Sequence, residues 1–348
     1  MISTICVIGA GTMGIGIAQL AAMHGHPTLV FDLNANTAVA SMAQLTERLS
    51  KRVAAGKMSQ QQLDDTLGNM QVVTEIQQLA AAGLIIEAVV EKKEVKQSLF
   101  QQLAEICPEQ TILASNTSSI SITAIASAVP QPERVVGLHF FNPAPVMKLV
   151  EIVKGLKTSP AIADALFSLM QTWQKVPVMA KSTPGFIVNR VARPYYAEGF
   201  RALQENVTTP QQLDYILRES GGFAMGPCEL TDLIGQDVNF SVTQSVYQEF
   251  FYEPRYRPSL IQKELVDAGC YGRKNKQGFY HYDTDQRTPI YTRPNLSVEL
   301  NAALKNQDFS QLNVQFCGDW GNCVGLSQRL DSVVGLQIQH LQQPQAST

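Results

Sequence analysis

A histidine and a glutamate twelve positions apart could form an acid–base pair in this sequence. The segment "HFFNPAPVMKLVE" begins with His139 at the end of an apolar run and reaches Glu151 after two prolines. Histidine can take a proton near neutral pH, and a carboxylate beside it can fix its tautomer and stabilise the imidazolium that forms. A histidine among apolar residues is more often a satisfied core side chain, so the rest of the chain has to decide.

Neutral polar side chains follow two other predicted elements. "SNTSS" (115–119) comes after a predicted strand, and "TPGFIVNR" (183–190) lies at the start of the predicted second domain. Asn116, Ser118 and Asn189 could hydrogen-bond to a reacting oxygen, which together with a base would suit the oxidation of an alcohol. The alternative is turn and cap chemistry, because Ser, Thr and Asn are frequent in turns for backbone reasons alone. These residue types leave both interpretations open.

A glycine-rich turn predicts a dinucleotide site near the N-terminus. Gly9, Gly11 and Gly14 have the G-x-G-x-x-G spacing, after a predicted strand and at the start of a predicted helix. They allow a tight turn, a close approach of pyrophosphate to the backbone and close helix–strand packing, and the helix N-terminus favours the anion. Asp32 ends the next strand, where a carboxylate binds ribose hydroxyls and disfavours a 2′-phosphate, so NAD is predicted. The alternative is a packing turn, with Asp32 as a helix cap. The predicted cofactor loop comprises Gly9, Gly11, Thr12, Met13 and Gly14.

The elements that must position these residues alternate between strand and helix patterns. In the helix predicted within 91–106, Val95, Leu99, Leu103 and Ile106 are expected to form the buried face. Strand–helix–strand units of this length predict a parallel sheet with right-handed crossovers. The fold class is therefore α/β: a Rossmann-like, mostly parallel sheet domain followed by a mostly α-helical domain. Strands are predicted at 3–9, 27–32, 84–90, 111–115 and 134–141.

Three segments are predicted along the chain. Residues 1–182 form the NAD-binding sheet domain, with a polar helical hairpin inserted at 36–70. Residues 183–283 form the helical domain. Residues 284–348 are a linker-like extension to which the pattern assigns no role, and one strand and one helix are predicted within 312–332.

Composition excludes several classes of protein. The chain has 348 residues, 45% hydrophobic and 16% charged, which predicts a globular protein of two domains. A net charge of −3 argues against nucleic acid or an anionic membrane as partner. No apolar run approaches the roughly 18 residues of a membrane span, and the N-terminus lacks the pattern of a signal peptide. The six cysteines form no metal-ligand cluster, so no metal is expected and reduced thiols in the cytoplasm are predicted.

Long stretches of the chain resemble the L-3-hydroxyacyl-CoA dehydrogenases. The resemblance extends from about residue 3 to 283, with its motifs in family order. Two further stretches, "RVARPYY" and "MGPCELTDLIGQDVNF", are most similar to the 3-hydroxyadipyl-CoA and 3-hydroxybutyryl-CoA dehydrogenases of bacterial phenylacetate breakdown. The motifs that carry the family resemblance are "GAGTMGIGIAQLAAMHGH", "IIEAVVE", "ASNTSSISIT", "GLHFFNPAPVMKLVEIV" and "STPGFIVNR".

The resemblance implies reversible oxidation of an (S)-3-hydroxyacyl-CoA to the 3-oxoacyl-CoA, with NAD as cofactor, in a cytoplasmic homodimer. His139 is then the base, Glu151 its partner, Ser118 the residue that bonds the substrate's 3-oxygen, and Asn189 completes the site. The run "GRKNKQGF" around Lys274 departs from the usual family pattern. The implied cofactor contacts beyond the glycine turn are Asp32, Glu91, Lys96, Asn116, Asn142 and Lys274.

Two hypotheses concern the substrate. Arg52 and Lys57 of the hairpin could bind the phosphates of CoA, although basic residues on such helices are often only solvated. Arg193 shares a helix face with Asn189, and its guanidinium could pair with a distal carboxylate. Such a pair would favour 3-hydroxyadipyl-CoA over the 3-hydroxybutyryl-CoA of short-chain fatty acid metabolism. The alternative is that Arg193 serves the dimer interface or an internal salt bridge.

A rival function is a non-catalytic homologue that binds NAD or acyl-CoA. It would share every motif above. The presence of all four candidate catalytic residues argues against it but does not exclude it.

Overall fold

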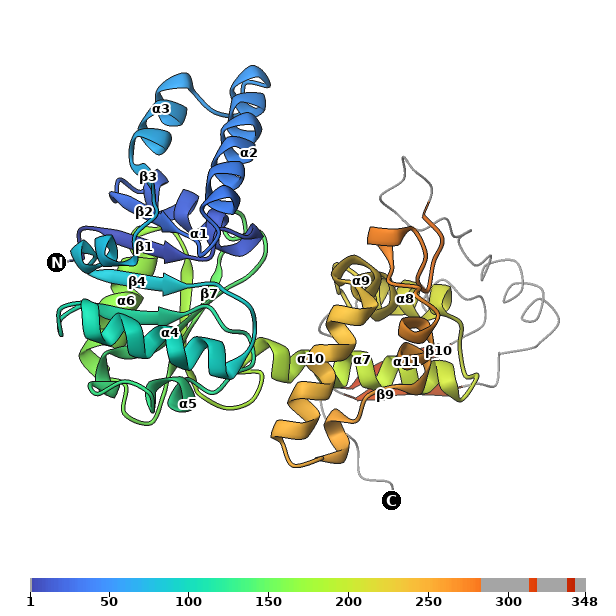
Figure 1. The fold of residues 1–348 in the computed structure, drawn as a ribbon. Coiled ribbons are helices and arrows are strands. Elements are labelled where there is room, and N and C mark those ends of the chain that lie inside the picture. Colours follow the sequence, from blue (N-terminus) through green and yellow to red (C-terminus); the bar gives the residue numbers. More distant parts are fainter. Residues whose placement is uncertain (1, 283–312, 318–336, 342–348) are drawn as a thin grey trace. The chain divides into compact units, whose positions relative to one another are not determined.

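The computed structural model describes residues 2–282, 313–317 and 337–341. Its contacts divide the chain into two compact units, Met1–Arg190 and Val191–Thr348 (Figure 1). The first unit is built on a sheet and the second on helices, so the predicted fold class is confirmed. No helix among the described residues is both long and apolar enough to cross a membrane.

An eight-stranded sheet forms the centre of the first unit. Its order is β3-β2-β1-β4-β5-β6-β7-β8, and every neighbouring pair is parallel except β6 and β7. The sequence pattern does not predict β3, β7 or β8 as strands. Strand β3 is short and exposes Gln71, the run around β7 suits a helix or a strand, and β8 is an edge strand that contains Pro177, which edges tolerate. The strands are β1 Ile5–Ile8, β2 Thr28–Phe31, β3 Met70–Val73, β4 Leu84–Glu87, β5 Ile112–Ser115, β6 Val135–Phe140, β7 Leu149–Lys154 and β8 Val176–Lys181.

Helices cover both faces of this sheet. Side chains alternate along each strand, so Ile5 and Val7 belong to one hydrophobic cluster and Cys6 and Ile8 to the other. Burial on both faces explains why the central strands are almost continuous apolar runs. One cluster takes in α1 Thr12–Met23, α2 Ala35–Ala54, α3 Gln60–Gly68 and α6 Pro160–Thr172, and the other η1 Ile76–Ala81, α4 Lys93–Ile106 and α5 Ile122–Ala126.

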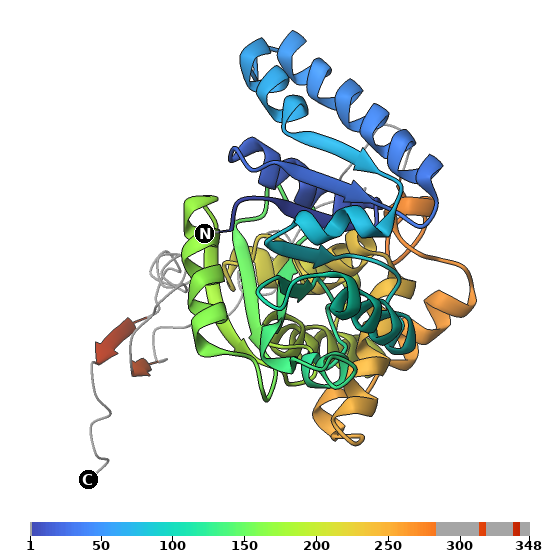
Figure 2. The ribbon, with the colours of Figure 1, turned by 60° about the vertical axis from the view of Figure 1, so that its left-hand side comes forward.

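The segment predicted as a helical hairpin contains α2 and α3, which stand off the sheet in Figures 1 and 2. Leu45 and Leu49 of α2 and Leu63 of α3 are buried in the sheet unit's core, and the remaining faces are polar. Asn34 and Ser59 cap the N-termini of the two helices with side-chain hydrogen bonds.

The predicted buried face of α4 is partly wrong. The helix buries Lys96, Phe100 and Leu103, whereas Val95 is 38% exposed. The error arises because a lysine within a helix pattern indicates solvent, while here a buried glutamate of the neighbouring strand pairs with it. Leu99 packs against the cluster but is only partly buried.

The second unit is a group of helices around a small aromatic core. Tyr196, Phe200 and Tyr280 belong to this core. Asp214 is fully buried and accepts hydrogen bonds from the first N–H groups of α9 and from the Tyr280 hydroxyl, which joins three segments of the unit. The elements are α7 Val188–Gln204, which begins at the end of the first unit, α8 Pro210–Glu219, α9 Pro227–Ile234, α10 Gln236–Glu249, α11 Leu260–Asp267, and the parallel pair β9 Asn313–Cys317 and β10 Gln337–Leu341.

Candidate active site

His139 and Glu151 face each other across the only antiparallel pair of the large sheet. The register of β6 and β7 sets them directly opposite, and opposite residues project from the same face. The Nδ1 atom of His139 lies 2.6 Å from Oε2 of Glu151. Both side chains are buried. The twelve-residue spacing is therefore that of a hairpin whose two strands bring the base and the carboxylate together.

The second carboxylate oxygen of Glu151, Oε1, binds the backbone near the end of the first unit. Oε1 accepts hydrogen bonds from the backbone N–H groups of Ile187 and Val188, both at 2.9 Å. These contacts keep residues 183–190 with the sheet. A carboxylate that accepts two N–H bonds is best satisfied when it is charged, so the hydrogen-bond network assigns the imidazole proton to Nδ1 and the lone pair to Nε2. The rings of Phe141 and Phe186 lie against the imidazole.

The "SNTSS" turn follows β5 and contacts both the base strand and the start of α7. Asn116 accepts a hydrogen bond from the backbone N–H of Phe140 through Oδ1, at 2.8 Å. Asn189 lies with its Nδ2 atom 3.5 Å from the carbonyl oxygen of Ser118. The structure thus joins the turn to the strand of His139 and to Asn189. All four predicted catalytic residues belong to the sheet unit.

Glu91 organises this turn. Its Oε1 atom accepts from the backbone N–H groups of Ser118 and Ser119, at 3.0 and 3.2 Å, and from the Thr117 hydroxyl at 2.5 Å. Burial opposes ionisation of Glu91, but the charge of Lys96 and these hydrogen bonds outweigh it and lower the pKa of Glu91. The carboxylate is therefore charged near neutral pH.

The glycine turn fits a dinucleotide. Gly9 has a φ of +94°, and a Cβ at Gly14 would lie 1.7 Å from the carbonyl oxygen of Gly9, so both positions require glycine. A Cβ at Gly11 would have no atom within 4 Å, which leaves the backbone open to a ligand. No side chain caps the N-terminus of α1 at Gly11, so its N–H groups can receive a pyrophosphate. Asp32 accepts from the N–H of Ala10 at 2.8 Å and directly follows β2, where a ribose would lie.

Family comparison agrees with this geometry. Residues 4–183 match the model of the 3-hydroxyacyl-CoA dehydrogenase NAD-binding domain, and residues 185–282 match that of the C-terminal domain of the same family. The chain belongs to the 3-hydroxyacyl-CoA dehydrogenase family. NAD is accordingly the cofactor of its first domain.

The relatives of this chain include proteins named after two different substrates. The chain is 53% identical to 3-hydroxyadipyl-CoA dehydrogenase of Escherichia coli K12 over 83% of its length, and 39% identical to 3-hydroxybutyryl-CoA dehydrogenase of Clostridioides difficile over 80%. It covers 61% of the Escherichia coli protein and 99% of the other. A crystal structure of 3-hydroxybutyryl-CoA dehydrogenase from Escherichia coli K12 matches with a TM-score of 0.80 at 53% identity, over 84% of this chain and 62% of that one.

The remaining predicted cofactor residues have varied surroundings. Asn142 is exposed in the loop after β6. Lys274 belongs to the helical unit, where its Nζ atom lies 2.6 Å from both carboxylate oxygens of Asp237 and above the ring of Tyr271. Lys96 is buried beneath the site. For these residues the cofactor contact stays a prediction.

Arg193 is buried in the helical unit. Its guanidinium donates to the carbonyl oxygen of Asn239 at 3.2 Å and to the hydroxyl of Thr243 at 2.7 Å, and it lies over the ring of Tyr196. Burial lowers the pKa of Arg193 to about 10, so it remains charged at neutral pH. These contacts with α10 favour an internal role for Arg193 over a contact with the acyl chain.

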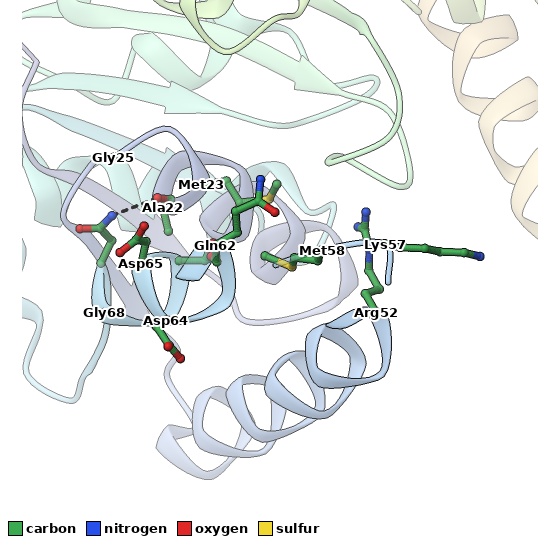
Figure 3. A pocket seen from close by; sticks show the side chains of 12 residues that line it. Ala22, Met23, Gly25, Arg52, Lys57, Met58, Gln62, Asp64, Asp65 and Gly68 are labelled. Carbon is green, nitrogen blue, oxygen red and sulfur yellow. Dashed lines mark hydrogen bonds between the residues drawn. The ribbon is translucent and has the colours of Figure 1, made fainter. Parts of the chain in front are cut away.

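Arg52 and Lys57 line a groove of about 580 Å³ between the hairpin and the end of α1. Figure 3 shows them at one end, with the Lys57 side chain directed away from Gln62, while Asp64 and Asp65 lie toward the other end. The groove includes the last residues of α1, about 18 Å along the helix from the glycine turn by the usual rise per residue. The two basic residues are therefore neighbours, on a surface away from the pyrophosphate position.

The sequence reading missed two buried residues next to the site. Glu87 ends β4 and is fully buried, and its only signal is an acid inside the apolar run "LIIEAVV". Lys175 is also buried, and its Nζ donates to the carbonyl oxygens of Ala144 and Met147 at 2.6 and 2.8 Å. The loop between His139 and Glu151 contains two prolines and so lacks two N–H donors. Lys175 supplies donors to the carbonyls of this loop.

Proposed function

We propose that this protein oxidises an (S)-3-hydroxyacyl-CoA to the 3-oxoacyl-CoA with NAD. The observation that carries the proposal is the buried pair of His139 and Glu151, with Nδ1 and Oε2 2.6 Å apart, at the edge that also presents the glycine turn. Family membership supports the same reaction. Because the chain covers only part of the Escherichia coli relative, its activity is proposed from this site and not taken over from that protein.

The side chains of this site have distinct tasks in the reaction. Nε2 of His139 takes the proton of the 3-hydroxyl group, and Glu151 stabilises the resulting imidazolium through Nδ1. Ser118 and Asn189 hydrogen-bond to the 3-oxygen as it becomes a carbonyl. NAD held at the glycine turn would supply the acceptor for the hydride that leaves C3. The flanking rings of Phe141 and Phe186 reduce access of water to the imidazole.

We propose 3-hydroxyadipyl-CoA as the preferred substrate, within the bacterial degradation of phenylacetate. The 53% identity to a protein named 3-hydroxyadipyl-CoA dehydrogenase supports this choice. The alternative is 3-hydroxybutyryl-CoA, which the names of other relatives support.

Initial rates with a panel of CoA thioesters test both the proposed reaction and the proposed substrate. The panel varies chain length and the presence of a terminal carboxylate, and NADH absorbance follows the reaction. The highest kcat/KM is expected for the six-carbon dicarboxylyl thioester. If the protein binds NADH but oxidises none of the thioesters, it is a non-catalytic homologue and the proposed reaction is wrong.

Arg193→Met is expected to lower kcat/KM for 3-hydroxyadipyl-CoA and 3-hydroxybutyryl-CoA by the same factor. The guanidinium is buried against α10, so its loss should loosen the helical unit and not remove a carboxylate contact. Loss of a buried charged donor should also destabilise the protein by about 2 kcal/mol, measured by urea unfolding. A much larger loss on the dicarboxylyl substrate alone would show instead that Arg193 binds the distal carboxylate.

Replacing Arg52 and Lys57 together by alanine is expected to raise the KM for a CoA thioester about 3- to 10-fold without changing kcat. We propose that these exposed cations bind CoA phosphates, which take no part in the chemistry. The matched control is the N-acetylcysteamine thioester of the same acid, which lacks the phosphates, so its KM should not change. An equal rise in KM for both substrates would contradict the phosphate role.

We further propose that the protein is a cytoplasmic homodimer. Val191, Ile216 and Phe251 of the helical unit are among its exposed apolar side chains, which a second copy of the chain would cover. Four of the six cysteines, Cys6, Cys107, Cys228 and Cys270, are free thiols, and three of these four are buried, as expected in a reducing compartment.

A further inference from the structure

A buried ion pair lies behind the turn that carries Ser118. Lys96 of α4 is 1% exposed, and Glu87 at the end of β4 is 0% exposed. The Nζ atom of Lys96 lies 2.6 Å from Oε1 of Glu87 and 3.2 Å from Oε2 of Glu91. Removing ions from water is costly, and the cost is offset only where the partners satisfy each other well. Here one ammonium group is shared by two carboxylates.

Glu87 is fixed by further contacts. Its Oε1 atom also accepts from the N–H of Val89 at 2.7 Å, and its Oε2 atom accepts from the Ser115 hydroxyl at 2.6 Å. These donors follow β4 and end β5, which are adjacent parallel strands. The carboxylate of Glu87 is therefore a rigid anchor, and it sets the position of the Lys96 ammonium.

Glu91 uses its two oxygens differently. Oε2 faces Lys96, while Oε1 accepts the backbone N–H groups of Ser118 and Ser119. The charged groups that face Glu91 in the described residues are Lys96 from α4 and, behind it, Glu87 from β4, since the turn contributes only N–H and hydroxyl groups. The two contacts connect a buried cation to the backbone of a proposed catalytic residue through a single carboxylate.

We propose that Lys96 and Glu87 are positioning residues that hold the Glu91 carboxylate on the Ser118 turn and so direct Ser118 toward the substrate's 3-oxygen. The task of Ser118 rests on the proposed function. With 1% of its surface exposed, Lys96 acts through Glu91. Glu87 keeps the ammonium in place and neutralises it within the buried pair.

Amide hydrogen exchange tests the structural part without any turnover. In the full chain, free of cofactor and substrate, Lys96→Met should speed exchange of the Ser118 and Ser119 amides about tenfold, because Glu91 is no longer held. Lys93→Met is the matched control, since Lys93 is on the same helix with its side chain 53% exposed. Unchanged exchange of the two amides in Lys96→Met would overturn the proposal.

A double variant separates positioning from general stability. Glu87→Gln combined with Lys96→Met removes both charges of the buried pair and should recover much of the stability that Lys96→Met loses. The amides of Ser118 and Ser119 should still exchange fast, because Glu91 still lacks its cation. If the double variant restores both stability and slow exchange, Lys96 has only a structural role and the proposal fails.

The pH profile of kcat/KM tests the catalytic part. Lys96 lowers the pKa of Glu91, so in the wild type the carboxylate stays charged as the pH falls. Without Lys96 the pKa of Glu91 rises, so the acid limb of the kcat/KM profile should move to higher pH. The factor by which Lys96→Met lowers kcat/KM relative to wild type is therefore expected to be at least about tenfold greater near pH 6 than near pH 8. An acid limb at the wild-type position would contradict the proposal.

A cycle with Ser118→Ala gives the decisive comparison. If Lys96 acts through Ser118, Lys96→Met should lower kcat/KM by about threefold or less in the Ser118→Ala background, because the effects of coupled residues are not additive. If the double variant instead loses the product of the two single losses in kcat/KM, the proposal is overturned. An inactive wild type would refute the proposed function alone, since the exchange experiment needs no activity.

Discussion

Glu151→Gln is expected to lower kcat by about 10³- to 10⁴-fold while changing KM little. The amide oxygen of the new side chain should accept the N–H bonds of Ile187 and Val188, which need an acceptor. The amide NH₂ group then faces Nδ1 of His139 and donates to it. Nδ1 must become the acceptor, the imidazole proton moves to Nε2, and the base can no longer take the proton of the hydroxyl group.

Two further variants show whether His139 and Glu151 act as a unit. His139→Ala should lower kcat by a similar factor. The double variant should have the same kcat as His139→Ala alone, because the carboxylate has no task without the imidazole. NADH binding, measured by fluorescence, should stay near the wild-type value in all three proteins. A Glu151→Gln enzyme that keeps more than about a tenth of wild-type kcat would contradict the assigned tautomer.

The residue types around this pair suggested acid–base chemistry, but they did not predict its geometry. The spacing of His139 and Glu151 has meaning only because β7 returns antiparallel to β6, and the segment between them could have been a helix or a strand. The glycine turn is the opposite case. There the spacing alone determines local backbone contacts, so Gly9 and Gly14 could be assigned tasks before any fold was known.

Buried charges are the part that the sequence pattern could not predict. The helical period of apolar residues places Lys96 in solvent, so it predicts the wrong buried face for α4. Glu87 and Lys96 are nine positions apart in different elements, and no local rule pairs a strand glutamate with a helix lysine. Arg193 gives the same lesson in the helical unit: the four-residue spacing from Asn189 predicts a shared helix face, but the acceptors on α10 are distant in sequence.

Three glycines of the cofactor turn and α1 are expected to respond to alanine in three different ways. Gly14→Ala should destabilise the protein by at least about 2 kcal/mol, because the new Cβ would lie 1.7 Å from the Gly9 carbonyl oxygen and backbone would have to move. Gly16→Ala is the matched control in the same helix. Its Cβ would meet Pro145 at 3.4 Å, an ordinary contact, so stability should be unchanged or slightly higher. Urea unfolding without cofactor measures both.

Gly11→Ala should separate folding from cofactor binding. A Cβ at Gly11 has no protein atom within 4 Å, and its φ of −66° suits alanine, so the apo protein should be as stable as the wild type. The same methyl group would occupy the space through which the pyrophosphate approaches the backbone. The Kd for NADH is therefore expected to rise about 100-fold, equivalent to about 2.7 kcal/mol of lost binding free energy. If Gly11→Ala binds NADH as the wild type does, the open space at Gly11 is not the pyrophosphate position. The dinucleotide would then have to lie elsewhere on the N-terminus of α1.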